Sequence, residues 1–443
     1  MSTEPQYHGK AFIRLALVFL LAGIVFGCVA GSMYLFPEFI KQNLGFQSLR
    51  PMHVTSIMFW ILLGATGCVY ISLSELSKTT ISASKVKIQL LLWIIAFCVI
   101  MYCYSTGRFG GREYWEFPSS LALFILIAWI LFLTSVVKLI RKISTWPVYV
   151  WMWLTGSVFF LFIFIENYLW LLPYFRKDLV SDMTIQWKVN GSIVGAWNQL
   201  IYGTSFYLLD RINGGNKIGR DRLAFIMYFL GLFNLMFNWG HHIYTLPTMS
   251  YVKYIGYAVS MTELVFFIRI VYNWKKTINE HRKHVYQYSY RFIIASEIWA
   301  FISLTHAILM SVPALNIYTH GTHVTVAHAM GTTIGINTMI LMAAAFMFLR
   351  NADSTRPKWF SFVFYLQQIS FLIFWLSLNI AGVSRGIWQM RDIRSSFSKM
   401  MDNLAPWFII FFISGLIMSV CIIIYIIYLL RSDKKDMKPL LAV

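Results

Sequence analysis

The chain has 443 residues, of which 58% are hydrophobic and only 12% are charged. A water-soluble domain carries about 25% charged residues, so the composition excludes a soluble fold and indicates that lipid covers most of the surface. The formal net charge of +19 would suit an acidic partner such as nucleic acid, but its distribution along the chain indicates another origin.

Long apolar segments follow one another along the whole chain. Each has about 18 residues or more, which is enough to cross a hydrocarbon core about 30 Å thick. They predict an all-α polytopic membrane protein with about twelve transmembrane helices. The expected spans are 12–36, 51–74, 87–106, 118–138, 147–172, 190–209, 223–246, 251–274, 290–312, 320–349, 359–382 and 405–430.

Positive charge is divided unevenly between the two sides of this predicted bundle. Connections on the side of the N-terminus carry about twice as many Lys and Arg side chains as those on the other side. The positive-inside rule therefore places both tails, 1–11 and 431–443, in the cytoplasm. No polar linker is long enough to separate domains, so we expect one membrane domain over residues 1–443.

Six of the ten histidines fall at span ends that face the same, extracytoplasmic side. Ionisable residues at membrane depth are costly and usually functional, and neutral imidazole is a common ligand of iron, copper and zinc. These histidines therefore predict a haem or metal site, whereas His306, alone in the ninth span, is expected to be packed or hydrogen-bonded. The six are His53, His241, His242, His320, His323 and His328.

His241 and His242 are adjacent in the sequence, so they can bind the same metal only if the local backbone allows it. On a regular helix they would point about 100° apart, so both reach one metal only near a helix end or a local distortion. Gly240 and Pro247 favour such a distortion. In the tenth span, His328 and Met330 project about 200° apart, which would let one helix serve two centres.

Several segments together resemble the large subunit of bacterial nitric oxide reductase, a member of the haem-copper oxidase superfamily. The likeness extends over residues 45–350 and keeps the family's order. The matching segments are Leu49–His53, Gly110–Tyr114, Gly240–His242, Glu263 and Thr319–His328.

The resemblance implies a protein of the bacterial inner membrane with two haems, expected to be of the b type, together with non-haem iron and calcium. His53 would ligate the low-spin haem, with Met330 at the other axial position, and His328 would hold the high-spin haem. His241, His242 and Glu263 would bind the non-haem iron. Arg112 would bind a haem propionate, and Glu113 would bind calcium.

The chain departs from the family pattern at the tenth span, where the family has a second low-spin haem ligand. Here Met330 stands in place of that histidine. If Met330 ligates, the haem becomes His/Met, which raises its reduction potential. Otherwise, that haem is five-coordinate or absent.

The sixth span shows the other departures. The family supplies a third metal-binding histidine there, but residues 54–240 contain none; its place falls on Asn190 or Gly191, depending on the alignment. Two family glutamates of this span are also replaced. The alignment that gives Asn190 puts Val194 and Asn198 in their places, and the alignment that gives Gly191 puts Gly195 and Gln199 there. The remaining oxygen donors, among them Glu263 and the Asn190 amide, favour iron over copper.

Three classes of function remain open. The first is an oxidoreductase that acts on nitric oxide, either by reducing it to nitrous oxide or by disproportionating it. Loss of the two family glutamates of the sixth span favours disproportionation, because that reaction needs fewer proton carriers. The second is a haem-binding subunit of an oxidase or reductase complex without full catalysis. The third is a secondary transporter, which leaves the six histidines unexplained.

An enzyme of the first class needs electrons from outside the chain. No Cys-x-x-Cys-His motif for attached haem occurs in the sequence. We expect a haem c-containing small subunit, cytochrome c or quinol as the donor.

Overall fold

The computed structural model describes residues 7–215, 218–244, 246–259, 261, 285–350, 359–391 and 395–431. Regular structure in these ranges is helical apart from one isolated bridge between Arg112 and Trp115. The predicted all-α fold is confirmed.

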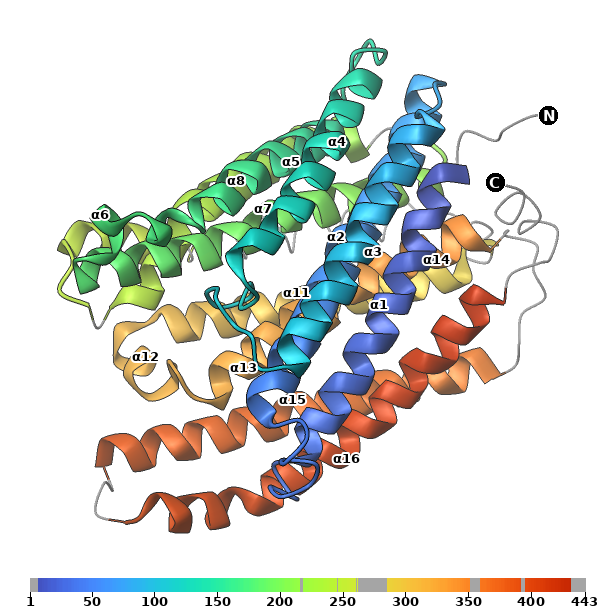
Figure 1. The fold of residues 1–443 in the computed structure, drawn as a ribbon. Coiled ribbons are helices and arrows are strands. Elements are labelled where there is room, and N and C mark those ends of the chain that lie inside the picture. Colours follow the sequence, from blue (N-terminus) through green and yellow to red (C-terminus); the bar gives the residue numbers. More distant parts are fainter. Residues whose placement is uncertain are drawn as a thin grey trace.

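The first half of the chain forms long helices joined by turns and by longer loops, among them the loop between α3 and α4 (Figure 1). In order they are α1 (Tyr7–Ser32), α2 (Phe46–Ser77), α3 (Ala83–Ser105), η1 (Ser119–Leu121), α4 (Ala122–Ile140), α5 (Val148–Glu166), η2 (Leu169–Leu171), α6 (Pro173–Arg176), α7 (Leu179–Asn213), η3 (Ile218–Arg220), α8 (Arg222–Phe237) and the 3-10 helix η4 (Asn238–Ile243).

The second half continues the bundle, and its last two helices lie side by side along one flank (Figure 1). Its elements are α11 (Gln287–Ser311), α12 (Pro313–Thr319), α13 (His323–Met330), the π-helical segment η5 (Gly331–Thr338), α14 (Met339–Leu349), α15 (Trp359–Arg391) and α16 (Phe397–Leu430).

Ten helices of the described residues are long and apolar enough to cross a membrane, so the chain is a multi-pass membrane protein. They correspond to ten of the expected spans. The expected span 190–209 lies within α7, a long helix that is less apolar than the others. The expected span 251–274 falls largely outside the described residues.

The most extensive helix–helix contacts are those between α1 and α2, between α15 and α16, and between α5 and α7. α2 and α14 lie innermost, because most of their residues are buried, whereas α1, α3 and α4 each leave much of their surface exposed. Large aromatic side chains fill the space between helices, and the fully buried ones include Trp60, Trp93, Trp129 and Trp153.

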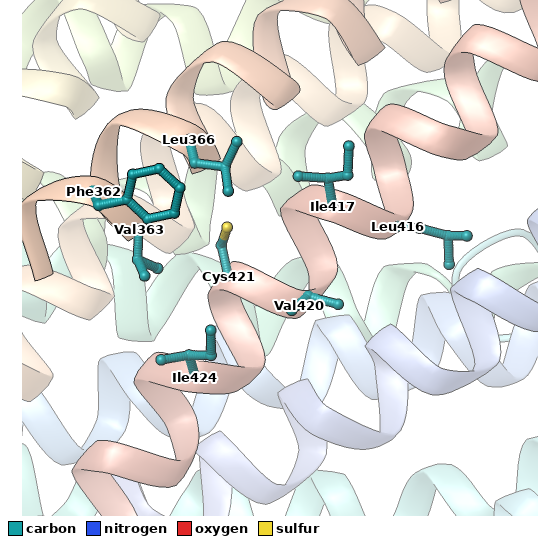
Figure 2. A pocket seen from close by; sticks show the side chains of 8 residues that line it. All are labelled: Phe362, Val363, Leu366, Leu416, Ile417, Val420, Cys421 and Ile424. Carbon is teal, nitrogen blue, oxygen red and sulfur yellow. The ribbon is translucent and has the colours of Figure 1, made fainter. Parts of the chain in front are cut away.

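An apolar hollow lies between α15 and α16 (Figure 2). Its lining side chains carry no charged group, and the single heteroatom among them is the Cys421 thiol. The exposed Phe362 and Val420 belong to this surface, which suits contact with lipid chains. None of the candidate site residues lines it.

Candidate haem and metal site

The His241–His242 pair lies in η4, directly after α8. At Gly240 a Cβ atom would stand 2.7 Å from the Val252 carbonyl oxygen, so glycine permits the close approach of this backbone to that of Val252. The two imidazole centroids are 4.2 Å apart, with their planes at 41°. The local distortion predicted from the sequence is confirmed.

His320, the residue that follows α12, comes close to this pair. Its ring centroid is 5.8 Å from that of His242. Trp187 of α7 stacks flat against His242, at 5.0 Å and an interplanar angle of 7°, and lies 5.3 Å from His320. Four aromatic rings from η4, α7 and the end of α12 therefore gather in one place.

His328 of α13 lies near the same group of rings. It lies close enough to His241 and to His306 for electrostatic interaction with both. Its ring centroid is 5.7 Å from that of His306 on α11, which in turn lies 5.1 Å from the ring of Trp375. The sequence correctly suggested a packed His306, but gave no signal that His328 would be its neighbour, because the two belong to different helices.

The ring nitrogens of this group are suited to metal coordination. Nδ1 of His241, His242 and His328 and Nε2 of His320 are buried without a hydrogen-bond partner. A buried polar atom left unpaired costs about 1–3 kcal/mol, and coordination would remove that cost. In the described parts of the chain, however, no three His, Cys, Asp or Glu side chains already converge on one point at ligand geometry.

His53 of α2 lies apart from this group, against α1. Its Nδ1 donates a hydrogen bond of 2.7 Å to the Gly23 carbonyl oxygen. Such a bond fixes both the tautomer and the orientation of an imidazole ligand and leaves Nε2 free for iron. The geometry around His53 fits an axial haem ligand.

Two further residues expected at the haems, the low-spin ligand Met330 and the propionate-binding Arg112, have packed surroundings. Met330 is half-buried against the main core. The Arg112 guanidinium binds Asp182 of α7 at 2.7 Å and lies 5.2 Å from the centre of the Trp170 ring.

His323 is held between Tyr34 and Phe408, at ring-centroid distances of 5.9 Å and 5.1 Å. The structure thus separates the six histidines that the sequence grouped by depth. His241, His242, His320 and His328 gather, whereas His53 and His323 lie elsewhere.

The connection between α3 and α4 carries the expected calcium ligand Glu113. Its carboxylate accepts a hydrogen bond of 3.0 Å from Arg50, and the same guanidinium donates to Glu116 at 3.1 Å. Burial raises the pKa of the Glu116 carboxyl, and the Arg50 charge partly opposes that effect. Calcium binding by Glu113 stays a prediction.

α7 supplies no imidazole to the metal pair. Asn190 is buried, and its Oδ1 accepts a hydrogen bond of 2.8 Å from Gln186. At Gly191 a Cβ atom would lie 2.8 Å from Cβ of Trp239, so no larger side chain fits there without a backbone shift. Glu263 lies outside the described residues.

Comparison with known proteins shows which family the chain belongs to. The chain matches the family described as Cytochrome C and Quinol oxidase polypeptide I over residues 8–417. It is 23% identical over 457 residues to a nitric oxide reductase subunit of Stutzerimonas stutzeri, covering 96% of this chain and 94% of that protein. A cbb3-type cytochrome c oxidase subunit of the same organism is 19% identical over 453 residues, covering 94% and 93%.

The fold is also that of a solved protein, a heme-copper terminal oxidase dimer determined by cryo-EM. The similarity has a TM-score of 0.75 at 15% identity and covers 98% of this chain and 85% of the other. Family members are oxidoreductases that bind haems and a metal at a binuclear centre and work with electron-donor partners such as cytochrome c. By its sequence match and its fold, the chain belongs to the haem-copper oxidase subunit I family.

Proposed function

We propose that this chain acts on nitric oxide, reducing two molecules to nitrous oxide and water with two electrons and two protons. The observation that carries this proposal is the His241–His242 pair, which lies near His328 and has buried, unpaired ring nitrogens. The similarity to a nitric oxide reductase subunit over nearly the whole chain supports it.

Each cofactor has a proposed set of protein ligands. His53 and Met330 would bind the low-spin haem of the b type, and His328 the high-spin one. His241, His242 and Glu263 would bind non-haem iron, with Asn190 beside it. When bound, the iron centres supply electrons and hold the substrates. Arg112 would pair with a haem propionate and Glu113 with calcium.

Electrons would come from a haem c-containing small subunit, cytochrome c or quinol. We further propose that residues 1–443 form one membrane domain in a bacterial inner membrane. Both termini would lie in the cytoplasm, and the histidine-rich helix ends would face the opposite side, consistent with the distribution of Lys and Arg.

The test is anaerobic turnover of isotopically labelled nitric oxide by the purified full-length protein in the presence of a chemical reductant. We expect one nitrous oxide for every two nitric oxide molecules consumed. A His242→Ala variant should lose this activity and keep its haem, whereas a His8→Gln variant, altered at the far end of α1, should keep both. Haem-loaded protein that forms no gas product would contradict the proposal and favour a non-catalytic haem subunit.

Disproportionation of two nitric oxide molecules to dinitrogen and dioxygen is a second candidate. The observation that favours it is the absence of carboxylates on the face of α7 near the metal pair, where either alignment gives Val194 and Asn198 or Gly195 and Gln199. A reaction that takes up no external protons needs fewer proton carriers. Formation of dioxygen from nitric oxide without a reductant would establish this alternative and exclude plain reduction.

A further inference from the structure

We propose that Lys253 is a positioning residue for the turn that carries His241 and His242. Its ammonium group fixes the backbone that follows the pair and brings a positive charge close to the proposed non-haem iron. The inference rests on the proposed metal centre. It concerns a residue that lies outside the segments resembling nitric oxide reductase and that belongs to none of the ligand sets above.

The backbone after η4 lacks hydrogen-bond donors of its own. Carbonyl groups at the end of a helix have no partner within the helix. For the Tyr244 carbonyl, the amide three residues later belongs to Pro247, which has no N–H, and the next amide, that of Thr248, bonds to the Leu246 carbonyl oxygen instead. Lys253 supplies the missing donor, because its Nζ donates to the Tyr244 carbonyl oxygen at 2.7 Å and to that of Leu246 at 2.8 Å.

The helical segment 250–259, which bears Lys253, also holds the beginning of the turn. Gly256 lies about one helical turn after Lys253, so both are on the same face of the segment. A Cβ at Gly256 would lie 2.9 Å from the Gly240 Cα and 3.2 Å from the His241 backbone nitrogen. One helix face therefore contacts the turn on both sides of the histidine pair.

Two other hydrogen bonds tie this turn to neighbouring helices. The Tyr244 hydroxyl donates to the Ser311 carbonyl oxygen of α11 at 2.9 Å. The Asn316 amide of α12 donates to the His241 carbonyl oxygen at 3.5 Å. Both join uncharged groups, whereas a hydrogen bond from an ionised donor is roughly twice as strong. The two bonds from Lys253 are therefore the main polar contacts that hold the turn.

The ammonium group also adds positive charge near the metal pair. Both of its acceptors are carbonyl oxygens, so neither hydrogen bond neutralises the charge. A positive charge close to a metal ion favours the reduced ion, because that ion repels it less. Lys253 therefore raises the reduction potential of iron bound at His241 and His242.

The first measurement is ferrous iron binding to purified, haem-loaded, full-length protein depleted of non-haem metal. In Lys253→Met, which lacks the donors, we expect binding about tenfold weaker or worse with an unchanged haem spectrum. Lys253→Arg keeps a cationic donor and should bind as the wild type does. The matched control is Lys399→Met, at an exposed lysine of α16, and Lys253→Gln serves if the methionine variant does not fold.

The second measurement is the midpoint potential of the non-haem iron at saturating iron, from a redox titration followed by electron paramagnetic resonance. It should fall in Lys253→Met and stay at the wild-type value in Lys253→Arg. Wild-type affinity and potential in Lys253→Met would overturn the inference and leave the proposed function standing. Equal losses in the arginine and methionine variants would also overturn it, because they would indicate a distorted fold rather than a lost cationic donor. A wild-type protein with haem that binds no non-haem iron would instead contradict the proposed function itself.

Discussion

A single backbone carbonyl orients His53. Because a carbonyl oxygen only accepts, its hydrogen bond to Gly23 requires the proton on Nδ1, which leaves the Nε2 lone pair for coordination. One turn later on α1, Gly27 clears the space that the ring needs, since a Cβ there would lie 2.6 Å from His53 Nδ1. Gly23 and Gly27 of α1 thus position His53, a candidate haem ligand on α2.

Gly27→Leu should therefore displace the His53 imidazole and remove the low-spin haem signal. The measurement is the dithionite-reduced minus oxidised absorption spectrum. Gly31→Ala is the matched control, because a Cβ there meets only ordinary contacts, 3.7 Å from Phe412. A full low-spin band in Gly27→Leu would show that His53 is not the ligand.

Met330 determines the potential of the low-spin haem if it coordinates the iron. Met330→His should convert a His/Met haem to bis-His, which lowers its midpoint potential, and Met330→Leu should alter both its spectrum and its potential. Redox titration followed by absorbance measures both effects. A low-spin spectrum and potential unchanged in Met330→Leu would rule out this assignment.

The sequence anticipated part of this residue-scale picture and missed the rest. The distortion at His241–His242 was predictable, because Gly240 and Pro247 are local signals. The closeness of His320 to His242, the stacking of Trp187 and the pairing of His306 with His328 depend on how helices meet. No local pattern in the sequence encodes such contacts.

In the connection between α3 and α4, the carboxylates of Glu113 and Glu116 both accept hydrogen bonds from the Arg50 guanidinium. Burial raises the pKa of Glu116, whereas Arg50 lowers it. Arg50→Gln removes the lowering influence, so the Glu116 pKa should rise further and its carboxyl should stay protonated to higher pH.

Infrared difference spectroscopy during a pH titration measures this change as the carbonyl stretch of a protonated carboxylic acid. Glu116→Gln assigns the band, and Arg108→Gln, which alters an exposed arginine of the same connection, is the control. A band that titrates at the same pH in Arg50→Gln and the wild type would contradict the proposed coupling.

The packing of α1 on α2 depends on two glycines that face each other. A Cβ at Gly67 would lie 2.7 Å from the Gly9 carbonyl oxygen, and one at Gly9 would lie 2.6 Å from that of Gly67. Small residues let membrane helices approach this closely. Gly67→Leu should therefore destabilise the protein by about 1–3 kcal/mol or more.

Thermal unfolding in detergent, followed by haem release or light scattering, measures this loss. Gly215→Ala is the control, because a Cβ at that position meets nothing within 4 Å. Equal unfolding midpoints for the two variants would mean that the α1–α2 contact contributes little to stability.

Helix boundaries were partly readable from local chemistry. α7 begins after Asp178, whose carboxylate accepts from the Ser181 amide, and ends before Gly214, which has a φ of 77°. Both are ordinary helix-capping signals, yet hydropathy alone restricted this helix to 190–209. The π-helical turns of η5 were not predicted from the sequence.

At the scale of the whole molecule, hydropathy predicts the fold class because lipid leaves backbone groups no partner outside helices or closed barrels. Ten of the expected spans are found as long apolar helices in the described residues. Periodicity and charge do not specify which helices touch. The arrangement of the helices was instead predicted from short motifs that occur in the same order as in a known family.

The central prediction concerns the cofactors of the whole protein, and the pyridine haemochrome spectrum combined with elemental analysis tests it most directly. We expect two b-type haems and one non-haem iron per chain. Protein purified from haem-replete cells that folds without haem, or that carries haem but no non-haem metal beside the His241–His242 pair, would contradict the proposed centre.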